Sequence, residues 1–138
     1  MSCEPALRQY FAQFDGTKKD FSTEAEHLFD NLVHEKFTLT LTDGTSVSRD
    51  AVKEMHADQL SKGNIATLVH FREIGFECVD AKFAVQNDRE GIYKITHLIY
   101  SIEDGKIASS QEVDDSSELT SFLLTLHEHV KAIHKIPK

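Results

Sequence analysis

Residues 21–44 read FSTEAEHLFDNLVHEKFTLTLTDG, and a change of apolar spacing within them decides the fold class. A helix is predicted over 24–34, and a capping box at Thr23–Glu26 marks its start. Its apolar face is made of Ala25, Leu28, Phe29 and Leu32. From Phe37 onward every second residue is apolar and the residues between are threonines, as far as Asp43-Gly44. The stretch therefore predicts a helix followed closely by a half-buried strand.

Two more amphipathic helices flank this unit. Residues 4–14 form the first, which ends at Asp15-Gly16, and its apolar face is Leu7, Tyr10, Phe11 and Phe14. Residues 49–62 form the second, which begins after the N-cap residue Ser48 and ends at Gly63-Asn64. Its inner face is expected to be Val52, Met55, His56, Gln59 and Leu60.

The remainder is predicted to be mostly β-structure. Residues 65–87 are rich in β-forming residues, and the pattern leaves open whether they form one bent strand or two. Alternation predicts that one face of this β-structure carries Val69, Phe71, Val79, Ala81, Phe83 and Val85. Strands over 92–103 and 106–114 are joined by Glu103-Asp104-Gly105-Lys106, where Asp-Gly favours a tight hairpin turn. A last amphipathic helix is predicted over 116–134. Helices come early and strands late, which indicates an α+β domain with a mainly antiparallel sheet covered on one face.

Composition limits the functions that need to be considered. The 138 residues are the length of one domain, predicted to span 1–138. The formal net charge of -8 argues against nucleic-acid and membrane-surface partners, which are bound mainly through Lys and Arg. No apolar run approaches the ~20 residues of a membrane-spanning helix, and no secretory signal is visible. Cys3 and Cys78 are expected to be free thiols in a reducing compartment, so we expect a cytoplasmic protein.

Several stretches, in their order and spacing, resemble the nuclear transport factor 2-like superfamily and, within it, the SnoaL-like (polyketide-cyclase-like) group. The segment LRQYFAQFDG at 7–16 is similar to the family's opening aromatic helix. Residues 21–44 resemble its helix–strand unit, and YSIEDGKIASSQEVDD at 100–115 resembles its closing hairpin. With SVSRDAVKEM at 46–55, the likeness covers residues 5–115.

The resemblance implies a cone-shaped, cystatin-like roll. Its curved antiparallel sheet would wrap around the three helices of the N-terminal half and leave an apolar pocket, with 116–134 as an added C-terminal helix. The open sheet face would form a homodimer. Enzymes of this family mostly use acid–base side chains without a cofactor or a metal, so we expect neither, and we expect a small, mostly apolar ligand. Two functions stay open: an isomerase, dehydratase or cyclase, and a non-catalytic dimerisation or interaction module with a filled cavity.

Three side chains are candidates for acid–base catalysis. Tyr10 matches the tyrosine that similar ketosteroid isomerases carry on their first helix, where a buried phenol can donate a hydrogen bond to an enolate. His56 and His97 could each shuttle a proton near neutral pH. Ordinary core packing is the competing interpretation for all three. Ligand contacts are expected from Phe14, Asp43, His70, Phe71, Phe83 and Tyr100.

Other residues leave alternatives open. The acidic residues of that isomerase are not matched cleanly, and Asp43, in an Asp-Gly pair, is more simply a turn residue. Glu112 is an inward candidate if Ser110 and Asp114 also face the interior. Charged residues that interrupt the strand over 65–87 form either an ion pair at a pocket or interface or the solvated face of a sheet edge: Arg72, Glu73 and Glu77. The histidines near the C-terminus lack metal-site spacing: His127, His129 and His134.

Overall fold

The computed structural model describes residues 3–114, and the helix expected over 116–134 lies outside that range together with its three histidines. Along the chain the elements are α1 Glu4–Phe11, α2 Thr23–Leu32, β1 Val33–Thr40, β2 Ser46–Ser48, α3 Arg49–Ser61, β3 Ile65–Gly75, β4 Cys78–Asn87, β5 Ile92–Glu103 and β6 Lys106–Val113. No helix among the described residues is long and apolar enough to cross a membrane.

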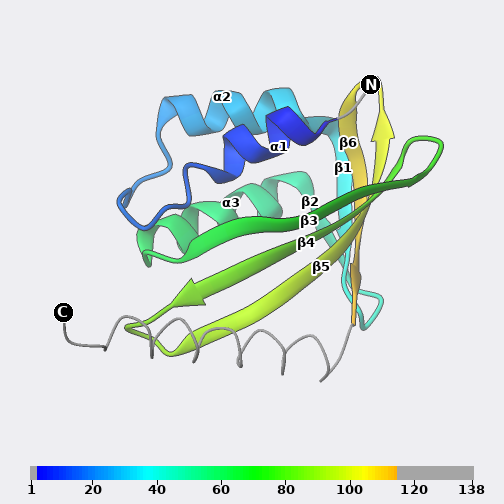
Figure 1. Ribbon diagram of the computed structural model, residues 1–138. Coiled ribbons are helices and arrows are strands. Elements are labelled where there is room, and N and C mark those ends of the chain that lie inside the picture. Colours follow the sequence, from blue (N-terminus) through cyan, green and yellow to red (C-terminus); the bar gives the residue numbers. More distant parts are fainter. Residues whose placement is uncertain (1–2, 115–138) are drawn as a thin grey trace.

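The sheet is curved, and the three helices lie on its inner side (Figure 1). Its strand order is β2-β1-β6-β5-β4-β3. All neighbouring strands are antiparallel except β1 and β6, which are parallel. The α+β cone with a mainly antiparallel sheet is therefore confirmed. The short strand β2 was not predicted, because three residues are too few for an alternating pattern to be recognised.

The helices begin at serine caps. Ser48 Oγ accepts a hydrogen bond from the Ala51 amide, as predicted for α3. The cap of α2 is Ser22, which accepts from the Ala25 amide, so the helix begins one residue earlier than the predicted capping box placed it. The first helix is shorter than predicted: α1 ends at Phe11, and tighter hydrogen bonds continue the turn as far as Phe14.

Residues 65–87 form two strands joined at Phe76 and Glu77. The prediction that Val69 shares a face with Phe71 is wrong. A register shift between Leu68 and His70 turns Val69 outward, where it is 51% exposed. Such a bulge inserts one extra residue, so Leu68 rather than Val69 precedes Phe71 on the inner face. The alternation predicted for β4 is confirmed, because its odd-numbered residues from 79 to 87 are buried.

The core lies between the helices and the inner face of the sheet. Its largest fully buried side chains are Leu7, Tyr10, Phe14, Phe29 and Leu60. Tyr100 pairs with Val79 on the inner face, whereas Tyr93 pairs with Gln86 on the outer face. The inner face of the sheet therefore contributes Tyr100 to the core that also contains Tyr10 of α1.

Candidate functional site

A tyrosine and a histidine meet inside the cone. The hydroxyl oxygen of Tyr10 on α1 lies 2.7 Å from Nδ1 of His56 on α3, although 46 positions separate them in sequence. Tyr10 is 1% exposed, and His56 is half-buried. Each residue is placed by helical spacing: Tyr10 lies on the buried face of α1, and His56 lies one turn from the buried Val52 and Leu60. The pair is a polar contact within an otherwise apolar interior.

Aromatic rings surround the imidazole of His56. The ring centroids of Tyr10, Phe11, Phe14 and Phe29 lie 5.5, 5.8, 5.8 and 5.9 Å from the imidazole centroid. We call these four rings the aromatic enclosure. Phe11 also contacts Phe83 on β4 with a centroid distance of 4.5 Å, which joins the enclosure to the inner face of the sheet. Three helices and one strand thus fix the position of the imidazole.

Burial keeps both partners neutral at pH 7. It lowers the pKa of His56 to about 4, because an imidazolium would lose its hydration among these rings. It also raises the pKa of the Tyr10 phenol well above its usual range, and the nearby Tyr100 phenol raises it further. Burial has the same effect on the pKa of Tyr100. The site therefore contains neutral hydrogen-bonding groups rather than an ion pair.

The pair can exist as two tautomers with different chemistry. If Tyr10 O–H donates to Nδ1, then Nε2 of His56 carries the remaining proton and is a neutral hydrogen-bond donor. If Nδ1–H donates to the phenol oxygen, then Nε2 has a free lone pair and is a weak base. A pKa of about 4 disfavours the imidazolium that such a base would form. The first tautomer suits a donor that polarises a carbonyl oxygen, which is a known role of neutral imidazole.

Most of the expected ligand-contacting aromatic residues do face the interior. Phe14 belongs to the aromatic enclosure, Phe83 and Tyr100 are buried on the inner face, and Phe71 is half-buried beside Ala81. Phe11 and Phe29 were predicted only as apolar helix faces. Phe11 and Phe29 contact His56 because the three helices converge. The apolar periodicity of a single helix does not reveal how helices pack against one another.

A polar row on β6 also faces inward. Ser110 pairs with Tyr100 and is buried, and Glu112 pairs with Leu98 two residues further along the same face. One carboxylate oxygen of Glu112 accepts a hydrogen bond from the Thr42 amide at 3.4 Å. Asp114, the next position of that parity, is exposed. Ser110 therefore adds a hydroxyl to the interior, whereas the Glu112 carboxylate lies at the edge of the inner face, where its bond to the Thr42 amide is exposed.

Two of the expected site histidines are on the wrong face. His70 and His97 both stand opposite Lys82, whose neighbours Ala81 and Phe83 are buried, so both histidines lie on the outer face. There they flank one carboxylate: His70 Nε2 lies 3.4 Å from Asp80 Oδ2, and His97 Nε2 contacts Oδ1. The expectation that they reach the interior is corrected. The bulge at Val69 changed the parity of β3, and period-two spacing alone does not say which face is inner.

The outer group has its own electrostatics. Burial alone would raise the pKa of the Asp80 carboxyl. The hydrogen bond from His97 and the charges of His97, His70 and Lys82 outweigh this effect, so the pKa is lowered.

Asp43, also expected near the ligand, is an exposed turn residue whose carboxylate accepts from the Thr45 amide at 2.8 Å. Hydrogen bonds from Thr45 lower its pKa, and it lies in the turn between β1 and β2.

One group of side chains within residues 3–114 brings metal-ligand atoms within 4.8 Å of one another: His34, Glu103 and Asp104. The Lys36 amide donates to His34 Nδ1 at 3.1 Å. In the neutral ring the remaining proton is then on Nε2, the nitrogen that faces Asp104 at 3.9 Å. A protonated nitrogen cannot ligate a metal, so this group fits a metal ion poorly.

An open cleft of about 300 Å³ lies against the aromatic enclosure. It runs between α1 and β3, and Phe11 and Phe14 form part of its wall. Leu68 and Ala66 line the β3 side. Phe11 and Phe14 therefore line this cleft and also contact His56.

Several solved structures share this architecture, and they are described as proposed polyketide cyclases or as a proposed ketosteroid isomerase. A proposed SnoaL-like polyketide cyclase from Jannaschia is 8% identical, with a TM-score of 0.60 over 87% of this chain and 88% of that one. A proposed polyketide cyclase from Streptomyces antibioticus is 11% identical, with a TM-score of 0.59 over 92% and 99%. A proposed ketosteroid isomerase from Kribbella flavida is 12% identical, with a TM-score of 0.59 over 80% and 75%.

The chain therefore has the nuclear transport factor 2-like fold of SnoaL-like proteins, as its motifs indicated. An uncharacterised cystatin-fold protein from Novosphingobium aromaticivorans matches equally well, at 12% identity and a TM-score of 0.60 over 82% of this chain and 98% of that one. No protein-family model and no curated protein matches the sequence. At such low identities the likeness concerns the fold, and the activity has to be argued from the site.

Proposed function

We propose that the chain binds a small, mostly apolar carbonyl compound inside the cone and catalyses its isomerisation or cyclisation without a cofactor. The observation that supports this most is the neutral Tyr10–His56 pair within the aromatic enclosure. In a core selected only for stability, a buried imidazole contributes little to the stability, because every buried polar group needs a hydrogen-bond partner. A site for acid–base chemistry can use such a pair to hold a proton on a chosen ring nitrogen.

In the proposed mechanism Tyr10 is a positioning residue and His56 is the electrophile. Tyr10 O–H donates to Nδ1 and so keeps the proton of the neutral ring on Nε2. Nε2–H then donates to the carbonyl oxygen of the ligand and stabilises the enolate that forms when an adjacent carbon loses a proton. The enclosing rings exclude water, which strengthens that hydrogen bond.

We propose Glu112 as the base, because its position on β6 belongs to the inner face of the sheet. It would take the proton from the carbon beside the carbonyl and return it at a second carbon. The proton count then balances within one turnover, so no co-reactant is needed. A ring closure would use the same enolate as the nucleophile.

The test is solvent-deuterium exchange. In D₂O, 2-tetralone and 5-androstene-3,17-dione are incubated with the protein, and loss of the proton next to the carbonyl is followed by ¹H NMR. We expect exchange above the buffer rate, and H56Q and E112Q should each reduce it by about 100-fold. H27Q is the matched control, because His27 is exposed on α2. Exchange that is equal in wild type and H56Q would contradict the assignment.

A non-catalytic module is the second candidate, and the close packing around Tyr10 favours it, because a phenol that is 1% exposed leaves little room for a ligand. In that case the outer sheet face would form a homodimer and the interior would only stabilise the fold. Light scattering would then show a dimer, and neither ketone would shift amide resonances around His56. For either function we propose a cytoplasmic location, because both cysteines are free thiols.

A further inference from the structure

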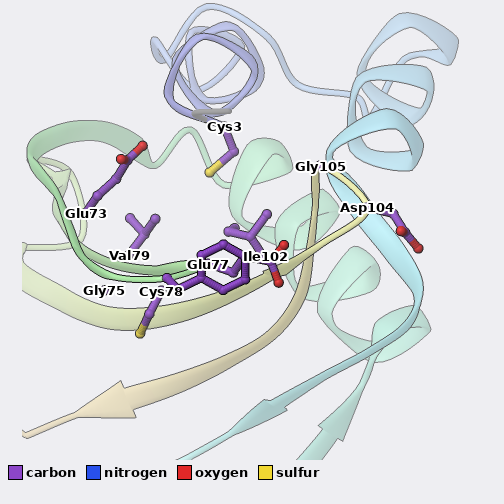
Figure 2. A pocket seen from close by; sticks show the side chains of 10 residues that line it. Cys3, Glu73, Gly75, Glu77, Cys78, Val79, Ile102, Asp104 and Gly105 are labelled. Carbon is purple, nitrogen blue, oxygen red and sulfur yellow. The ribbon is translucent and has the colours of Figure 1, made fainter.

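A large cleft among residues 3–114 lies apart from the Tyr10–His56 pair. Its volume is about 550 Å³, and it lies between the start of α1 and the turns of the β3–β4 and β5–β6 hairpins (Figure 2). None of the ten residues that line it belongs to the aromatic enclosure. We call it the hairpin cleft. A volume of this size is typical of small-molecule sites.

The floor of the hairpin cleft is apolar. Cys3, Val79 and Ile102 are 5%, 3% and 8% exposed. Cys3 reaches in from the helix side with its sulfur toward the strands, whereas the sulfur of Cys78 points away from it (Figure 2). Burial raises the pKa of the Cys3 thiol, and the charge of Glu73 raises it further, so the thiol is a neutral part of the floor.

The rim carries negative charge and an exposed ring. Glu73, Glu77 and Asp104 line the cleft, and none of its ten residues is Lys, Arg or His. Glu73 pairs with Val79 and so lies on the inner face, at a position where the strand pattern favours an apolar residue. Within residues 3–114 neither Glu73 nor Glu77 forms an ion pair. Phe76 is 93% exposed at the tip.

These features select one kind of occupant. A second copy of the chain would bring these carboxylates close to another molecule whose formal charge is also -8, which is unfavourable. The carboxylates would repel an anionic ligand, and a purely apolar ligand would gain nothing from them. A compound with an apolar body and a protonated amine satisfies both the floor and the rim, and the Phe76 ring offers a face for the cation.

We propose that the hairpin cleft is a binding site for small aromatic amines, separate from the interior site. The apolar body would rest on Cys3, Val79 and Ile102, and the ammonium group would lie between Glu73 and Glu77. This site involves no covalent step and does not depend on Tyr10 or His56.

The experiment compares two probes with the same body and opposite charge. Tryptamine and indole-3-propionate are titrated into the ¹⁵N-labelled full-length chain, and amide shifts are followed by NMR. Tryptamine should shift amides of residues 73–79 and 102–105, and indole-3-propionate should not. The double variant E73Q/E77Q should weaken tryptamine binding about fivefold, as expected for two partly exposed ion pairs. The matched double variant E24Q/E54Q removes the same charge from exposed helix positions and should bind as wild type does.

Three results would overturn the proposal. They are equal shifts with both probes, no shift with tryptamine up to its solubility limit, and equal weakening by the two double variants. The last would show that net charge alone attracts the amine. H56Q should leave tryptamine binding unchanged, so failure of the interior site and failure of the hairpin cleft can be told apart.

Discussion

The neutrality of His56 predicts a specific loss of stability in acid. In the unfolded chain the imidazole has a pKa near 6.5, whereas in the fold the pKa is about 4. Between these values the unfolded chain takes up a proton that the folded chain does not. The free energy of unfolding therefore falls as the pH is lowered from 6.5 toward 4, and the stabilisation from neutral His56 is fully present only above pH 6.5.

The two pKa values set the magnitude. At ~1.4 kcal/mol per pH unit the difference amounts to about 3 kcal/mol as an upper bound. His56 is half-buried rather than fully enclosed, so water near the ring reduces this, and we expect about 2 kcal/mol. With a typical urea m-value this corresponds to a shift of the denaturation midpoint by about 1 M.

Urea denaturation followed by circular dichroism measures the effect. Wild type and H56Q are compared above pH 6.5 and near pH 4, because glutamine does not titrate and can still bond to Tyr10. Wild type should lose about 2 kcal/mol more than H56Q across that range, since the other histidines and the carboxylates titrate in both proteins. H27Q should follow wild type. Equal losses in wild type and H56Q would refute the assignment of a buried neutral ring.

Three further predictions concern stability. Y10F should lower the free energy of unfolding by about 1–2 kcal/mol in urea denaturation, because it leaves a buried ring nitrogen without its hydrogen-bond partner. F29A should lower it by about 3–5 kcal/mol through the cavity it creates, whereas F76A should change it by less than about 0.5 kcal/mol, since Phe29 is 0% and Phe76 is 93% exposed. G63A should lower the melting temperature and G75A should not. Gly63 has φ +78 and a Cβ there would lie 3.0 Å from a lysine nitrogen, whereas nothing lies within 4 Å at Gly75.

Local signals determined most of the fold. The serine cap of α3, the Asp-Gly hairpin turn and the alternation in β4 are all set by neighbouring residues, so their interpretation from sequence is confirmed. The bulge at Val69 could not be predicted in the same way. Its position depends on how β3 pairs with β4 across their hairpin, which the spacing within one strand does not reveal.

For the candidate site too, some features could be predicted from the sequence and others depended on tertiary structure. Tyr10 and His56 could be named from their helix faces, but their hydrogen bond depends on how α1 packs against α3. His97 shows the opposite case. Its mid-strand position suggested the interior, yet only the register with Lys82 reveals that it lies on the outer face beside Asp80. Side-chain chemistry was visible in the sequence, whereas the partner of each side chain was set by tertiary structure.

The most direct test of the Tyr10–His56 pair is ¹⁵N NMR of the imidazole ring nitrogens across pH in wild type and Y10F. We predict a neutral His56 ring at pH 7 that titrates near 4 in wild type, with an Nδ1 resonance that moves when the Tyr10 hydroxyl is removed. A ring that titrates near 6.5, with nitrogen shifts that Y10F leaves unchanged, would contradict the account.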